Sequence, residues 1–94
     1  FEEAKALLRR TVPVARRVLG ESHDVTLRMR WCYADALCRD DSATLDDICE
    51  GVTTLEEIES TARRVLGSAH PLTAGIERSL RAVEAAISAN LPKP

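Results

Sequence analysis

Apolar residues recur along this chain at intervals of three and four positions, the spacing that places side chains on one face of an α-helix. Four segments show this pattern, which predicts helices over residues 1–19, 25–39, 44–66 and 71–91. No segment alternates between apolar and polar residues as a half-buried strand would. The sequence therefore predicts an all-α fold of about four helices in a single 94-residue unit.

The segments differ in how their apolar residues are distributed. The second is apolar on two sides, which is typical of a helix packed between neighbours. The fourth has a single apolar stripe, with charged residues over much of the remaining surface. In the first segment the residues at helical spacing are Phe1, Ala4, Leu8, Ala15 and Leu19, with Leu7, Val14 and Val18 beside them. In the second, one stripe is Leu27, Trp31, Ala34 and Cys38 and the other is Met29, Tyr33, Ala36 and Leu37. The predicted buried face of the third is Leu45, Ile48, Val52, Leu55, Ile58, Ala62 and Leu66, and the single stripe of the fourth is Ile76, Leu80, Val83 and Ile87.

The predicted helix ends carry recognisable residues. Gly20 and Gly67 follow the first and third segments in the position where glycine commonly ends a helix. Thr44, with an acidic residue three places on, predicts a capping box at the start of the third segment. Pro71 suits the first turn of the fourth. Pro13 lies inside the first segment, where it removes a backbone donor, and so predicts a kink or break near residue 12.

One helix end and turn occurs twice. ARRVLGESHDVT at residues 15–26 and ARRVLGSAHPLT at residues 62–73 are identical at eight of twelve positions, with a constant interval of 47 residues. A recurring helix end and turn is typical of stacked helix pairs, each of which buries its apolar faces only against its neighbours.

The recurring pattern V-L-G-x-x-H-P-x-T resembles the junction of kinesin-light-chain-type tetratricopeptide repeats. The second copy matches it fully and the first has Asp24 in place of proline, while the opening FEEAKALLRR resembles the second helix of that repeat. The resemblance implies an α-solenoid of antiparallel helix hairpins that serves as a protein–protein interaction scaffold. It also implies that the recurring residues are structural turn residues, namely Gly20, His23, Thr26, Gly67, His70, Pro71 and Thr73.

In such an array the four segments would be B, A, B and A helices. Terminal repeats need a polar outer face, and Glu77, Arg78, Arg81 and Glu84 supply one on the fourth segment. We therefore expect the chain to be a piece of a longer protein, at the C-terminal end of its array.

By this resemblance the second segment lines a groove, and it carries a polar stripe of Arg28, Cys32, Asp35 and Arg39. The spacing of these residues places them along one side of a helix. Arginine binds carboxylates bidentately, so we expect the stripe to bind a peptide or protein partner, with an acidic one favoured. The alternative is an ordinary solvent-facing surface with an internal pair between Asp35 and Arg39, and the sequence leaves both open.

The remaining composition narrows the function classes. A net charge of −2 disfavours nucleic-acid binding, no apolar run is long enough to span a membrane, and the sequence lacks a nucleophile elbow or a glycine-rich phosphate loop. We therefore predict no enzyme activity and no cofactor. The odd number of cysteines, without a CxxC pair, disfavours a disulfide framework and favours a reducing, cytoplasmic compartment.

Several other patterns have a structural and a functional interpretation. His23 and His70 could ligate a metal, but their interval of 47 residues favours a role in fastening each turn, so no metal site is predicted. The acidic run of residues 40–47 lacks the glycine of a calcium loop. The arginine pairs at 9–10, 16–17 and 63–64 suit a solvated face or an anion-binding patch. As a whole, the chain has an alternative role as a structural cap or self-association segment with no ligand of its own.

Overall fold

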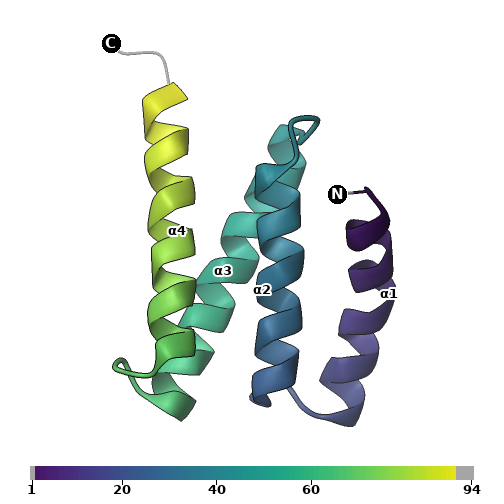
Figure 1. The fold of residues 1–94 in the computed structure, drawn as a ribbon, viewed down its shortest axis with the longest axis vertical. Coiled ribbons are helices and arrows are strands. Elements are labelled where there is room, and N and C mark those ends of the chain that lie inside the picture. Colours follow the sequence, from purple (N-terminus) through teal and green to yellow (C-terminus); the bar gives the residue numbers. More distant parts are fainter. Residues whose placement is uncertain (1, 91–94) are drawn as a thin grey trace.

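The computed structural model describes residues 2–90 and contains, in that range, the helices α1 (Glu2–Val18), α2 (Asp24–Arg39), α3 (Leu45–Leu66) and α4 (Pro71–Asn90) (Figure 1). The described residues form no strand, so the all-α prediction is confirmed. Each predicted helix end that falls within residues 2–90 lies within one residue of its observed position. Phe1, which falls at helical spacing, and the predicted helix end at 91 lie outside the described residues.

Consecutive helices run antiparallel, and α2 is the central one (Figure 1). It contacts α1, α3 and α4, whereas α1 contacts α2 alone. Helix α3 crosses behind α2 and also packs against α4, so that α1 and α4 lie at opposite edges of the molecule. The two edge helices therefore present the faces that lack a neighbouring helix.

The core consists of two clusters on the two sides of α2. The larger lies among α2, α3 and α4 and contains Leu27, Ala34, Leu55, Ile58, Ala62, Leu72 and Ile76. The smaller lies between α1 and α2 and contains Val12, Tyr33 and Leu37. The two apolar sides predicted for α2 are thus each covered, because α2 is the helix with neighbours on both sides.

Two glycines allow α3 and α4 to approach α2 closely. A Cβ atom built on Gly51 would lie 2.4 Å from Sγ of Cys38, and one built on Gly75 would lie 2.5 Å from Cη2 of Trp31. Any larger residue would force a helix or a side chain to move. The closest contacts of α2 therefore depend on the absence of these two side chains.

Most of the apolar residues that fall at helical spacing in α1 are not buried. The residues of α1 that are buried are Lys5, Val12 and Ala15. Ala4, Leu7, Val14, Val18 and Leu19 are exposed, Val18 by 70%. The reason is that α1 has one neighbouring helix, which covers a single narrow face.

Two further expectations are corrected. Leu45 is 77% exposed and Ile48, Val52, Val83 and Ile87 are only half-buried, because the first half of α3 and the last half of α4 diverge (Figure 1).

The break expected from Pro13 does not occur, since α1 is continuous from Glu2 to Val18. Pro13 is exposed, and its ring removes only one backbone donor from the helix.

Candidate functional site

The two copies of the repeated turn have the same geometry. Nδ1 of His23 accepts a hydrogen bond from the N–H of Val25, and Nδ1 of His70 accepts one from the N–H of Leu72, both at 3.1 Å. Each histidine directly precedes a helix, α2 or α4. Both side chains therefore satisfy a backbone donor at the start of a helix that would otherwise lack a partner.

The glycines and threonines of the two turns also correspond. Gly20 and Gly67 each have a φ of 92°, a conformation that residues with a side chain rarely adopt. Thr26 and Thr73 are both fully buried. The hydroxyl of Thr26 donates to the carbonyl of Ala15 at 3.3 Å, whereas that of Thr73 has no hydrogen-bond partner within residues 2–90. Pro71 opens α4, at the position that Asp24 occupies in α2.

A nearly buried ion pair joins α1 to the end of α2. Nζ of Lys5 lies 2.7 Å from Oδ2 of Asp40, and the two side chains are only 9% and 10% exposed. The hydrogen bond from Lys5, followed by that from the backbone N–H of Ser42, lowers the pKa of Asp40 to about 2. The hydrogen bonds to Asp40 and then Glu2 raise the pKa of Lys5. We call α1 and α2 the first helix pair and α3 and α4 the second. The ion pair stabilises the first pair at the end opposite the turn that connects its two helices.

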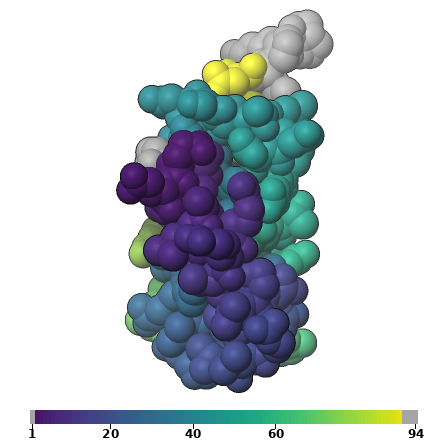
Figure 2. Space-filling view, turned by 90° about the vertical axis from the view of Figure 1, so that its right-hand side faces the viewer, coloured from purple at the N-terminus to yellow at the C-terminus, as the bar shows by residue number. Residues whose placement is uncertain are grey.

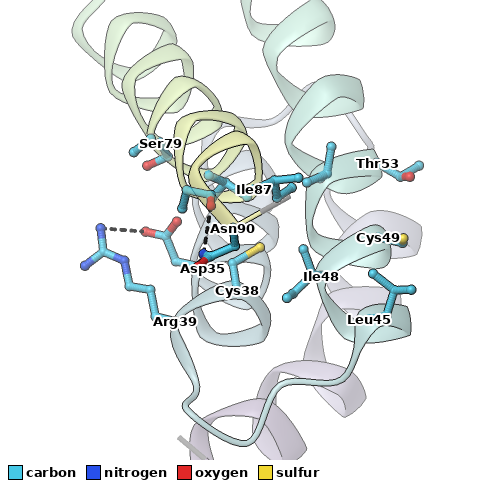
Figure 3. A pocket seen from close by; sticks show the side chains of 14 residues that line it. Asp35, Cys38, Arg39, Leu45, Ile48, Cys49, Thr53, Ser79, Ile87 and Asn90 are labelled. Carbon is cyan, nitrogen blue, oxygen red and sulfur yellow. Dashed lines mark hydrogen bonds and ion pairs between the residues drawn. The ribbon is translucent and has the colours of Figure 1, made fainter. Parts of the chain in front are cut away.

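The corresponding positions in the second helix pair are apolar. At the interval of 47 residues, Lys5 corresponds to Val52 and Asp40 to Ile87. Both line a groove of about 640 Å³ among α2, α3 and α4 (Figure 3). The lining residues are Asp35, Cys38 and Arg39 from α2; Leu45, Ile48, Cys49, Val52 and Thr53 from α3; and Ser79, Ala82, Val83, Ala86, Ile87 and Asn90 from α4. The second pair thus has an apolar groove where the first has an ion pair.

Polar side chains lie at the edge of this groove. Oδ2 of Asp35 lies 4.0 Å from a guanidinium nitrogen of Arg39, a long separation for an ion pair (Figure 3). Burial raises the pKa of Asp35, an effect that Arg39 partly offsets. Ser79 is held in place, since its Oγ accepts a hydrogen bond of 2.8 Å from the indole Nε1 of Trp31. An apolar floor with a loosely paired carboxylate and guanidinium at its edge suits an amphipathic ligand.

The structure divides the polar stripe predicted on α2. Asp35 and Arg39 line the groove, but Arg28 and Cys32 are exposed residues outside its lining. Nε of Arg28 lies 3.7 Å from Oδ2 of Asp24 on the same helix. The part of the stripe near the C-terminal end of α2 is therefore the part that belongs to the candidate site.

The apolar residues that α3 contributes to the groove, Leu45, Ile48 and Val52, lie on the face whose spacing predicts burial in the core. The periodicity of α3 and α4 is the same for a buried face and for a face that lines a groove. The sequence does nevertheless distinguish the two helix pairs, because at the interval of 47 residues the charged residues Lys5 and Asp40 are replaced by Val52 and Ile87. The two helix pairs therefore differ at this end in chemistry as well as in shape.

The acidic run has structural partners. Thr44 and Asp47 form the predicted capping box, in which each side chain accepts a hydrogen bond of 3.1 Å from the other residue's backbone N–H. Asp40 pairs with Lys5, as described above. Within residues 2–90, no group of three or more histidine, cysteine or acidic side chains could hold a metal ion.

The arginine pairs contribute to links within and between helices. Arg16 pairs with Glu21, and Arg63 pairs with Glu59 and with Glu77 of α4. The phenol of Tyr33 accepts a hydrogen bond from Arg9 at 3.4 Å and donates one to Glu50 at 2.9 Å, which connects α1, α2 and α3.

None of the helices in residues 2–90 is sufficiently long and apolar to cross a lipid bilayer. Comparison of the chain with family models, with curated proteins and with solved structures finds no match.

Proposed function

We propose that the chain is a segment of a tetratricopeptide-type helical-repeat scaffold, and that the groove among α2, α3 and α4 binds a helix of a partner protein. The observation that carries this proposal is the replacement of the Lys5–Asp40 ion pair by Val52 and Ile87, which line an apolar groove instead. The shared geometry of the two turns, with histidines and glycines in the same roles, supports the repeat interpretation.

The dimensions of the groove fit a short helix. Its α4 wall extends from Ser79 to Asn90, which is about 16 Å at a rise of 1.5 Å per residue, or roughly three helical turns. Amphipathic helices bind such grooves through apolar residues spaced at three, four and seven positions. Leu45, Ile48 and Ile87 provide the apolar surface that these residues would contact.

The charges at the edge suggest how the partner helix is oriented. The side chain of Arg39 is largely exposed and only loosely held by Asp35. An acidic residue on the partner would pair with Arg39, and a basic one would pair with the half-buried carboxylate of Asp35. Such edge contacts mainly set specificity and orientation, while apolar burial provides most of the affinity.

The test is a selection from a display library of amphipathic helical peptides on the purified chain. Peptides that bind the groove should bind at least tenfold more weakly to the variant V52K/I87D, which introduces the residues of the first helix pair. The control V65K adds a charge to an exposed site on α3 outside the groove, and binding to it should be unchanged. Equal binding of every selected peptide to all three proteins would contradict the proposal.

A specific observation favours a second role, as the cap of a longer array. Ala34 and Leu37 of α2 are fully buried, but the corresponding residues of α4 are the exposed Arg81 and Glu84. A polar outer face is what the last helix of a stacked array requires. Replacing these residues with those of α2, as R81A/E84L, should lower solubility; unchanged solubility would count against the capping role.

For the cellular setting, we propose the reducing environment of the cytoplasm. Cys32, Cys38 and Cys49 are all free thiols, which persist where disulfides are kept reduced.

A further inference from the structure

Helix α1 has an apolar stripe that no other part of the described chain covers. Leu7, Val14 and Val18 lie within about 20° of one direction around the helix at 100° per residue, and they are 54%, 46% and 70% exposed. Figure 2 shows α1 on the surface of this side of the molecule. The corresponding residues of α3 are Thr54, Thr61 and Val65, so this apolar face is more pronounced on α1 than on its repeat equivalent.

The stripe matches the groove in length. From Leu7 to Val18 it covers eleven residue steps, the same number as the α4 wall from Ser79 to Asn90. Both are therefore about 16 Å long. Because α1 contacts only α2 and lies at the opposite edge from α4, its stripe cannot enter the groove of its own molecule (Figure 1).

An arginine beside the stripe can pair with one of the two charged groups at the groove edge. Arg10 and Arg17 lie next to the apolar residues on one flank of α1, both are exposed, and neither forms an ion pair with any residue in the range 2–90. The groove edge has the carboxylate of Asp35 and the exposed guanidinium of Arg39, which lie 4.0 Å apart. A guanidinium from α1 would give this half-buried carboxylate a closer partner.

We infer that the groove of one molecule takes α1 of a second copy of this chain, with Leu7, Val14 and Val18 against the apolar floor and an arginine at Asp35. The inference rests on the proposed function in that it uses the same helix-binding groove, and it names the helix. It requires the outer face of α1 to carry no stacked neighbouring repeat, so it and the array-cap role are alternatives. Because the two surfaces differ, the contact forms a reciprocal dimer, a closed ring or an open chain of molecules.

The test is the molar mass by light scattering across a range of protein concentrations. The unmodified chain should form dimers or larger species that dissociate on dilution. L7E/V18E on the stripe and V52K/I87D in the groove should each raise the dissociation constant of self-association at least tenfold. V65E is the matched control, since Val65 corresponds to Val18 and is also exposed at the end of a helix; its mass should equal that of the unmodified chain.

Mixing the two impaired variants gives the decisive result. L7E/V18E retains an intact groove and V52K/I87D an intact stripe, so together they should form a 1:1 heterodimer. A mixture that stays monomeric, or an unmodified chain that is monomeric at every concentration, would overturn the inference. If a variant loses helical content, V14C in the unmodified background replaces it. Under oxidation it should crosslink to a second copy through a groove cysteine, Cys38 or Cys49. The crosslink should be lost in C38S/C49S, and equal crosslinking with and without these two substitutions would overturn the inference.

Failure of this inference is distinguishable from failure of the proposed function. L7E/V18E keeps the groove open, and it can be used as the target for the helical peptide library. Peptides that bind it and not V52K/I87D would support the groove as a partner site even where self-association is absent.

Discussion

The ammonium group of Lys5 lies 2.7 Å from the carboxylate of Asp40, and the residues 47 positions later, Val52 and Ile87, both line an open apolar groove. An ion pair at these two positions thus stabilises the first helix pair, whereas apolar residues at the same positions of the second pair can contact an apolar ligand. This contrast within one chain is the basis for the proposal that the second pair binds a helix.

The ion pair predicts a specific acid dependence of stability. The pKa of Asp40 is lowered from 3.8 to about 2 in the folded chain, so the folded state holds this proton less tightly than the unfolded state. The stabilisation is therefore complete above pH about 4 and is lost as the pH falls toward 2. Asp40→Asn should lower the thermal midpoint at pH 7 and have little effect near pH 2.

Thermal unfolding followed by circular dichroism at several pH values measures this difference. Asp41→Asn is the control, because the neighbouring Asp41 is exposed and its replacement should leave the pH profile unchanged. A constant difference between Asp40→Asn and the unmodified chain from pH 7 to pH 2 would contradict a stabilising role for the ion pair.

Asp35 should show the opposite pH dependence. Burial raises its pKa, so the folded state holds this proton more tightly than the unfolded state and the ionised carboxylate opposes folding at neutral pH. Asp35→Asn should therefore raise the midpoint of urea unfolding at pH 7, and the gain should shrink as acid protonates Asp35 in the unmodified chain. A lower midpoint at pH 7 would show that the pair with Arg39 outweighs the burial.

Gly51 is predicted to be intolerant of a side chain. Alanine gains about 1 kcal/mol over glycine in helix propensity, but its Cβ would meet Sγ of Cys38 at 2.4 Å and the carbonyl oxygen of Ala34 at 3.2 Å. Overpacking of this kind costs about 1–3 kcal/mol, so Gly51→Ala should be destabilising by up to about 2 kcal/mol in urea unfolding. The double variant Gly51→Ala/Cys38→Ala should recover part of the lost unfolding free energy. No recovery would show that the added Cβ does not clash mainly with Cys38.

The histidine at the start of α4 predicts a capping effect. His70→Ala removes the acceptor for the N–H of Leu72 and should cost about 1 kcal/mol of unfolding free energy, as loss of a helix cap does. His70→Asn retains a side-chain acceptor and should restore most of it. Equal losses for alanine and asparagine would indicate that packing of the ring, and not its hydrogen bond, is what matters.

Much of the fold could be predicted because the chain repeats its helix ends. Glycine at 20 and 67, the Thr44 capping box and the apolar periodicity located each helix to within one residue. Periodicity could not show which apolar faces are covered, because that depends on how many neighbours a helix has. Leu45, which lies on the predicted buried face of α3, is thus 77% exposed.

The candidate site was predicted only in part for the same reason. The spacing of the stripe on α2, together with the resemblance that places this helix in a groove, indicated Asp35 and Arg39, but it also included Arg28 and Cys32, which lie outside the groove. The apolar walls depend on the divergence of α3 from α4, a tertiary feature that the pattern of each helix alone does not contain. Comparison of the two helix pairs residue by residue would have revealed the change from Lys5 to Val52.

The measurement that tests the central claim most directly is the affinity of one library-selected helical peptide for L7E/V18E with and without the further substitutions V52K and I87D. Fluorescence anisotropy of the labelled peptide gives both dissociation constants. The groove proposal predicts at least tenfold weaker binding when the Lys–Asp pair replaces Val52 and Ile87. Equal affinities, with both proteins folded, would contradict it.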